Sequence, residues 1–152
     1  MTALDHHTLT ATSRFDDFYE PSGNASHTLY ATPALATSYE AVRLDTGTPI
    51  FMRAPGEAPG SAALEGAIDE MAEACGMDPL AFRLKNYAEV EPISGKPFSS
   101  KALRECYAQG AKRFGWAGRP LAPRSMRSIR ARASFPRLSA LVHLRAKLVA
   151  TW

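Results

Sequence analysis

The sequence predicts an α+β fold, with short strands in residues 1–53 followed by three helices at about 61–75, 78–86 and 99–114. The first part is rich in threonine and in alternating polar and apolar residues, which is typical of strands. The second part repeats apolar residues three and four positions apart, between helix-starting and helix-stopping residues. This order of elements, strands first and helices later, is that of an α+β domain.

The first part contains four segments that we predict to be strands, at residues 2–12, 27–32, 38–45 and 50–52. The last of them, Ile50-Phe51-Met52, is a continuous apolar run, which indicates a strand buried on both faces. On the first strand the adjacent His6 and His7 would point to opposite faces, so they cannot easily share a metal ion. We expect both histidines to be solvated.

The central helix has the clearest boundary signals. Ser61 is expected to cap its N-terminus and Gly76 to end it. Its apolar residues recur at helical spacing and form one face. This face consists of Leu64, Ala67, Ile68, Met71 and Cys75.

The two later helices have similar signals. Asp78 is expected to cap the second helix, with Pro79 in its first turn, where the missing N–H of proline costs nothing. For the third helix the expected cap is Ser99 or Ser100, and the expected stop is Gly115.

Composition narrows the class of protein. The 152 residues, 45% of them hydrophobic, are enough for one domain. No run of 18 apolar residues occurs, so no transmembrane helix is expected, and the first residues lack the pattern of a signal peptide. Cys75 and Cys106 both fall on predicted helices, where they suit core positions in a reducing compartment. No Cys or His spacing indicates a metal site.

The net charge of +3 is unevenly distributed. Residues 1–118 carry all 15 acidic residues and 10 of the 18 basic ones, whereas residues 119–152 carry the other 8 basic residues and no acidic one. We therefore divide the chain into a domain, residues 1–118, and a basic tail, residues 119–152. A basic tail can bind nucleic acid or an anionic membrane, but no aromatic platform interleaves its basic residues as single-strand binders require.

Residues 54–60, APGEAPG, connect the last predicted strand to the central helix. Their two prolines and two glycines make a stiff, irregular turn. A strand end, such a turn and a helix N-terminus can together hold an anion, because backbone N–H groups point out of the helix and Arg53 adds a fork of donors. The alternative is that Arg53 forms a structural ion pair, and the turn matches neither phosphate-binding signature.

Three stretches, FMRAPGEAPG, ALEGAIDEMAEACGMDPLAFRLKNY and GKPFSSKALRECYAQGAKRFGW, resemble the molybdenum-binding large subunit of the xanthine dehydrogenase/aldehyde oxidase family. Upstream, DDFYEPSGNASHTLYA and VRLDTGTP resemble the bacterial aldehyde oxidoreductase branch of the same family. The resemblance covers about residues 1–127. It implies that residues 1–118 are a fragment of a larger molybdopterin-binding domain.

The resemblance also implies a cofactor, partners and a reaction. The cofactor would be molybdopterin cytosine dinucleotide with molybdenum, and the partners an iron–sulfur subunit and an FAD subunit. The reaction would be a two-electron oxidation of a small aldehyde or N-heterocycle with oxygen from water. The expected compartment is the cytoplasm, with the periplasm, reached by co-export with a partner subunit, as the alternative. No nucleic acid and no side-chain metal ligand is expected.

The resemblance assigns roles to the turn. Arg53 matches the arginine beside the molybdenum, so it is the expected catalytic residue and, with Ala54 and Gly56, the expected cofactor-binding group. Pro55 and Glu57 are expected to line the substrate pocket, although Glu57 could be purely structural. Pro55 stands where purine-oxidising relatives have an aromatic residue, and this departure favours an aldehyde.

The resemblance ends at about Arg127. Residues 128–152 have the composition of a GC-rich coding strand read in a wrong frame, so we expect a frameshift there. The family's general base, a late glutamate, and its pterin-binding segments have no counterpart, so we expect the isolated chain to be inactive. Two alternatives remain, a small protein that binds nucleic acid or an anionic membrane through the basic tail, and an inert gene remnant.

Overall fold

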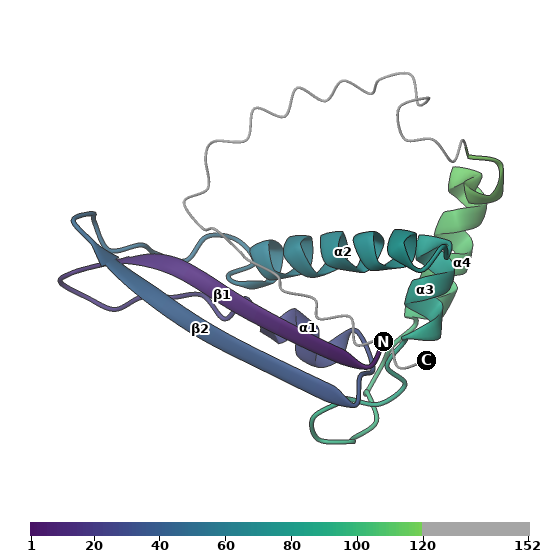
Figure 1. Cartoon of the computed structure of the whole chain (residues 1–152), viewed down its shortest axis with the longest axis horizontal. Coiled ribbons are helices and arrows are strands. Elements are labelled where there is room, and N and C mark those ends of the chain that lie inside the picture. The colour runs from purple at the N-terminus through teal and green to yellow at the C-terminus, as the bar shows by residue number, and fades with distance from the viewer. Residues whose placement is uncertain (120–152) are drawn as a thin grey trace. The chain divides into compact units, whose positions relative to one another are not determined.

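The computed structural model describes residues 1–119 (Figure 1). The chain divides into two compact units, whose described parts are residues 1–98 and 99–119. The mixture of strands and helices confirms the α+β prediction. The boundary between the units lies inside the expected domain of residues 1–118, and the expected basic tail and frameshift lie outside the described residues, except for Arg119.

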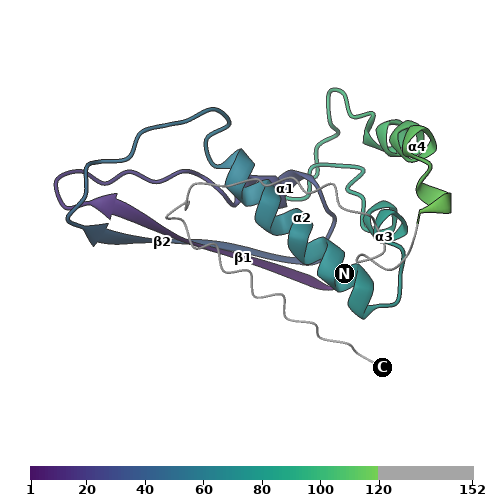
Figure 2. The same cartoon turned by 90° about the horizontal axis from the view of Figure 1, so that it is seen from above.

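The sheet of the first unit consists of two long parallel strands, β1 (Ala3–Ser13) and β2 (Ala34–Leu44). They pair in register from Ala3 opposite Ala34 to Ser13 opposite Leu44. The predicted strands at residues 2–12 and 38–45 are thereby confirmed. The helices α1 (Asn24–Thr28) and α2 (Glu57–Ala74) lie on one side of this sheet (Figure 2).

Two of the predicted strands are wrong. Residues 27–32 fall at the end of α1 and just after it, because two parallel strands need a crossover between them and α1 lies in that crossover. Residues 50–52 form no strand, because no described segment pairs with them. They are not buried either, since Ile50 is 78% and Met52 76% exposed.

The core of the first unit lies between α2, α1 and β1. Every fourth residue of α2 from Gly60 onward is buried, in the row Gly60, Leu64, Ile68 and Ala72. Around this row pack Leu4, Ala25, Tyr30 and Phe82. The prediction of the apolar face is therefore correct for Leu64 and Ile68 at its centre, whereas Cys75 is exposed. The expected core role of Cys75 is wrong, because the helix ends at Ala74 and Cys75 takes its exposed C-cap position.

The helix α2 begins at Glu57, four residues before the expected cap. Gly56 occupies the N-cap position with φ of +71°, and Ser61 lies inside the helix, so the prediction that Ser61 caps it is wrong. Pro59 falls in the first turn, where proline is tolerated. At the other end, Gly76 takes the left-handed conformation and donates to the carbonyl of Glu73, as predicted for a stop.

The helix α3 (Pro79–Lys85) matches its prediction closely. The side chain of Asp78 accepts from the backbone N–H groups of Leu80 and Ala81, so Asp78 is the N-cap. Arg83 on this helix donates from Nε to Glu65 at 2.7 Å and from Nη1 to Asp69 at 2.6 Å, which ties α3 to α2.

The second unit contains α4 (Leu103–Phe114) and a short 3-10 helix, η1 (Trp116–Gly118). The cap expected at Ser99 or Ser100 is wrong, since Ala102 holds the N-cap position without a side-chain hydrogen bond. Gly115 ends the helix in the left-handed conformation, as predicted. No residue of α4 is buried, so Cys106 has no core role. Among the helices of residues 1–119, none is both long and apolar enough to cross a membrane.

Candidate functional site

The turn at residues 53–57, which precedes and starts α2, is the expected site. Arg53 is exposed, and within residues 1–119 its guanidinium forms neither an ion pair nor a hydrogen bond. The alternative that Arg53 is a structural ion-pair partner thus finds no support in the described part of the chain. An exposed, unpaired guanidinium is available to an anionic or oxygen-rich ligand.

Ala54 has an unusual backbone conformation. Its φ is +58°, and no other non-glycine residue among residues 1–119 has a positive φ. Left-handed backbone costs a residue with a Cβ about 1–2 kcal/mol, and such strain concentrates at functional sites. The carbonyl of Ala54 accepts from the N–H of Ala58 at 3.1 Å, so the strained residue is tied to the first turn of α2.

Gly56 is buried, unlike the other residues of this turn. A Cβ atom on it would lie 2.8 Å from the carbonyl carbon of Pro21, so only glycine fits here. Its N–H donates to Oε2 of Glu20 at 2.8 Å. The close backbone approach that Gly56 permits is therefore made by the chain's own residues 20 and 21.

Glu20 also bears on the predicted anion site. A carboxylate is favoured at a helix N-terminus by the helix dipole and by the free backbone N–H groups. Glu20 supplies that carboxylate from 36 residues upstream. Sequence reasoning missed it, because nothing in the local sequence DDFYEPSGN relates Glu20 to the turn. Glu57 lies in the first turn of α2 and Pro55 just before it, and both are exposed.

An apolar strip leads to Arg53. Ile50 and Met52 are exposed, and the ring of Phe51 meets the ring of Phe18 edge-on at a centroid distance of 4.7 Å. Phe15, in the same upstream loop as Phe18, is 93% exposed. Apolar side chains of this kind next to a cation fit a surface that another polypeptide segment or a ligand covers.

The two adjacent histidines differ from expectation. They point to opposite faces of β1, as predicted. Only His7 is partly exposed, and its ring shares a hydrogen bond with the hydroxyl of Ser38. His6 is fully buried and shares a 2.7 Å hydrogen bond with Ser26, so its predicted solvation is wrong. It is buried because α1 covers this face of the sheet. Its Nε2 has no hydrogen-bond partner within residues 1–119, and burial lowers the pKa of its imidazole, as does the nearby His27.

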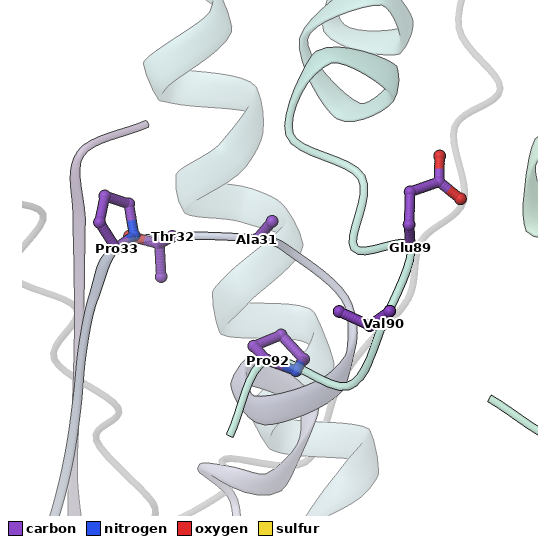
Figure 3. Close-up of a pocket in the computed structure, with 6 residues that line it drawn as sticks. All are labelled: Ala31, Thr32, Pro33, Glu89, Val90 and Pro92. Carbon is purple, nitrogen blue, oxygen red and sulfur yellow. The ribbon is translucent and has the colours of Figure 1, made fainter. Parts of the chain in front are cut away.

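A separate small cavity of about 310 Å³ lies beside the start of β2 (Figure 3). Two short segments line it, Ala31, Thr32 and Pro33 on one side and Glu89, Val90 and Pro92 on the other. The carboxylate of Glu89 points away from Val90 and Pro92 in Figure 3. No residue of the turn at 53–57 contributes to this cavity. Within residues 1–119, no three His, Cys, Asp or Glu side chains gather as metal ligands would.

The part of the chain that contains the turn is similar in sequence to known proteins. The family described as "Molybdopterin cofactor-binding domain" matches residues 1–87. A stretch of 109 residues is 43% identical to the aldehyde oxidoreductase molybdenum-binding subunit PaoC of Escherichia coli K12, covering 71% of this chain and 15% of that protein.

A second relative is more distant. The putative xanthine dehydrogenase molybdenum-binding subunit XdhA of the same strain is 33% identical over 103 residues, which cover 64% of this chain and 14% of that protein. The chain therefore spans only about 15% of the length of the curated relatives it matches.

Proposed function

The chain belongs to the molybdopterin cofactor-binding domains of the xanthine dehydrogenase/aldehyde oxidase family, and we propose that it is a segment of a molybdenum hydroxylase large subunit. The observation that carries this proposal is Arg53, an exposed cation that no side chain of residues 1–119 pairs with, followed by a strained Ala54, inside the stretch that matches the family. The activity belongs to the whole enzyme, because the chain spans only a small part of its relatives.

The cofactor in this proposal is molybdopterin cytosine dinucleotide with molybdenum. When bound, it supplies the two-electron oxidation of the substrate with oxygen taken from water. The substrate is a small aldehyde, since Pro55 offers no aromatic ring for stacking on a purine. An iron–sulfur subunit and an FAD subunit complete the enzyme. The chemistry of the turn fits this cofactor, because the turn presents an exposed guanidinium that no carboxylate of residues 1–119 binds.

The residues of the turn have distinct parts in the proposal. Arg53 stabilises negative charge that develops on an oxygen of the substrate or cofactor, as a cation placed next to the reacting atoms does. Ala54 aims its backbone at the cofactor, and Gly56 contributes to cofactor binding through the shape of the turn. Pro55 and Glu57 line the substrate pocket.

The isolated chain is expected to be inactive. The chain spans about 15% of the length of its relatives, and the apolar strip beside Arg53 is exposed. The cytoplasm is the proposed compartment, with the periplasm by co-export as the alternative. The free thiols of Cys75 and Cys106 support a reducing compartment.

The test is a chimera in which the matched residues of this chain replace the corresponding 109 residues of PaoC. We expect the chimera to bind molybdenum and oxidise a small aldehyde. Arg53→Ala should lower kcat per bound molybdenum by about a hundredfold or more, as loss of an electrostatic donor does. A chimera with full molybdenum and an Arg53→Ala variant of unaltered kcat would exclude the proposed role of Arg53.

A further inference from the structure

We propose that Glu20 is a positioning residue that holds the turn carrying Arg53 in its working conformation. The effect of Glu20 on catalysis rests on the proposed function. The contact between Glu20 and the turn does not depend on that function. Glu20 does not touch Arg53. It acts through the backbone of Gly56, whose N–H donates to Oε2 of Glu20 at 2.8 Å.

The contact is specific to this carboxylate. Among residues 1–119, Glu20 is the only one whose side chain forms a hydrogen bond with the turn at residues 53–57. The bond is charge-assisted, and such bonds are about twice as strong as neutral ones. It also places a negative group at the N-terminus of α2, where the helix dipole favours it.

Glu20 is itself mounted on a rigid segment. The N–H of Ser22 donates to the Glu20 carbonyl at 2.8 Å, which closes a tight turn. One residue further on, the N–H of Gly23 donates to the hydroxyl of Tyr39 on β2 at 2.7 Å. The segment formed by residues 20–23 is thus fixed to the sheet, and its carboxylate can impose a position on the turn.

The segment formed by residues 20–23 also packs closely against α2 at two glycines, Gly56 and Gly60. A Cβ atom on Gly56 would lie 2.8 Å from Pro21, and one on Gly60 would lie 1.9 Å from the carbonyl oxygen of Ser22. These close approaches leave the start of α2 little freedom to shift along or away from the segment. The hydrogen bond from Gly56 to Glu20 then fixes how the chain enters the helix.

The turn needs a stabilising contact from another segment because its backbone is strained. Ala54, with φ of +58°, would relax to a right-handed or extended conformation if nothing opposed it. Relaxation would rotate the adjoining peptide and swing Arg53 away from its position. Without Glu20, Arg53 would still be present and charged, but its backbone would no longer be held in one conformation, and misplacement of a catalytic group lowers the rate.

Trypsin provides a direct test on the full 152-residue chain, because Arg53 is exposed and followed by Ala54. We expect Glu20→Ala to raise the rate of cleavage after Arg53 by about tenfold, the effect of losing one charge-assisted hydrogen bond. Glu20→Gln keeps an acceptor oxygen and should restore most of the protection. The matched control is Glu70→Ala, which removes a carboxylate from the exposed face of α2 and should leave the rate unchanged.

Cleavage after Arg83 distinguishes local release from unfolding, because Arg83 is held between α2 and α3. Local release speeds cleavage after Arg53 alone, whereas unfolding speeds both. Should unfolding dominate, amide hydrogen exchange in Glu20→Ala replaces the protease, with the buried Leu64 as the reference for global unfolding. A larger ratio of Gly56 to Leu64 exchange than in the Glu70→Ala control would support the contact, and an equal ratio would overturn it. Equal cleavage of wild type and Glu20→Ala after Arg53 would also overturn the proposal.

In the PaoC chimera, Glu20→Ala should lower kcat by about tenfold with little change in KM, and Glu20→Gln should rescue most of the loss. A purely structural role would instead lower the molybdenum content and the yield. If protection at Arg53 depends on Glu20 but Arg53→Ala leaves kcat of the chimera unaltered, the proposed function fails and the contact stands. If Arg53→Ala abolishes turnover but Glu20→Ala changes neither the cleavage rate nor kcat, the positioning role of Glu20 is excluded and the proposed function stands.

Discussion

The carbonyl oxygen of Ser22 occupies the place where a side chain on residue 60 would begin, since a Cβ atom built on Gly60 would stand 1.9 Å from it. The backbone of α2 therefore lies directly against the loop that precedes α1. Gly60 is also the first member of the buried row that continues through Leu64 and Ile68. The closeness of this one contact sets how deeply the N-terminal half of the helix can pack.

Replacing Gly60 tests this contact. Gly60→Ala should lower the free energy of unfolding by about 1–3 kcal/mol, because backbone atoms, which cannot rotate away, must shift to admit the methyl group. Gly66 in the same helix is the matched control, since nothing lies within 4 Å of its Cβ position. Gly66→Ala should raise stability by about 0.5–1 kcal/mol, which is the usual helix-propensity gain. Urea denaturation measures both, and equal effects of the two substitutions would contradict the packing.

Arg83 is expected to stabilise the pairing of α2 and α3. Its side chain is only 13% exposed and bonds Glu65 and Asp69. Burial lowers the pKa of the guanidinium, but the hydrogen bonds to Asp69 and Glu65 raise it more, so the net pKa lies above its ordinary value. Arg83→Met should lower the free energy of unfolding by about 1–3 kcal/mol. This loss is smaller than that expected for a fully buried ion pair, because both carboxylates reach solvent.

The control for Arg83 is the exposed pair of Arg43 and Asp17, whose two hydrogen bonds have similar lengths. Arg43→Met should give no measurable change in thermal denaturation, because exposed ion pairs contribute little. Arg83→Lys should recover only part of the loss, since one ammonium cannot span the two carboxylates as the guanidinium does. An equal loss for Arg43→Met and Arg83→Met would show that burial does not matter here.

Local signals predicted much of this fold. Gly76 and Gly115 end their helices where expected, and Asp78 starts α3, because each signal acts on its own backbone within a few residues. The alternating patterns of the first part placed β1 and β2 for the same reason. These features need no knowledge of the remaining chain.

What failed depends on distant partners. Residues 50–52 have the composition of a buried strand, but a strand forms only with a neighbour, and none is among residues 1–119. Within the site, the resemblance pointed to Arg53, and the structure adds its exposure and the strain at Ala54. The bond from Gly56 to Glu20 spans 36 residues, so no local pattern could have revealed it.

His6 should make the chain sensitive to acid. Its pKa is lowered by burial and by His27, against a smaller opposing effect of Asp5, so the folded state takes up a proton less readily than the unfolded state. Unfolding therefore becomes easier as the pH falls below about 6.5, the ordinary histidine value, and the effect saturates below the lowered pKa of the folded state. Urea denaturation at about pH 7.5 and pH 5 measures this loss.

His6→Gln should flatten the loss of stability between these two pH values, because it removes the titrating group. His7→Gln is the control, since His7 lies on the opposite face of β1 with a partly exposed side chain. This variant should retain the acid sensitivity of the wild-type chain. The assignment to His6 would be abandoned if both variants lost stability with pH as steeply as the wild type does.

The N-caps give a final test of where the helices start. Oδ1 of Asp78 accepts from Leu80 at 2.9 Å and from Ala81 at 3.0 Å, so Asp78→Ala should lower the free energy of unfolding by about 1 kcal/mol. Ser61→Ala is the matched comparison, because Ser61 has the composition of a cap but lies inside α2. There alanine is the better helix former, so this variant should be neutral or slightly stabilised. A cost at Ser61 as large as that at Asp78, measured by urea denaturation, would show that α2 begins at residue 61 in solution.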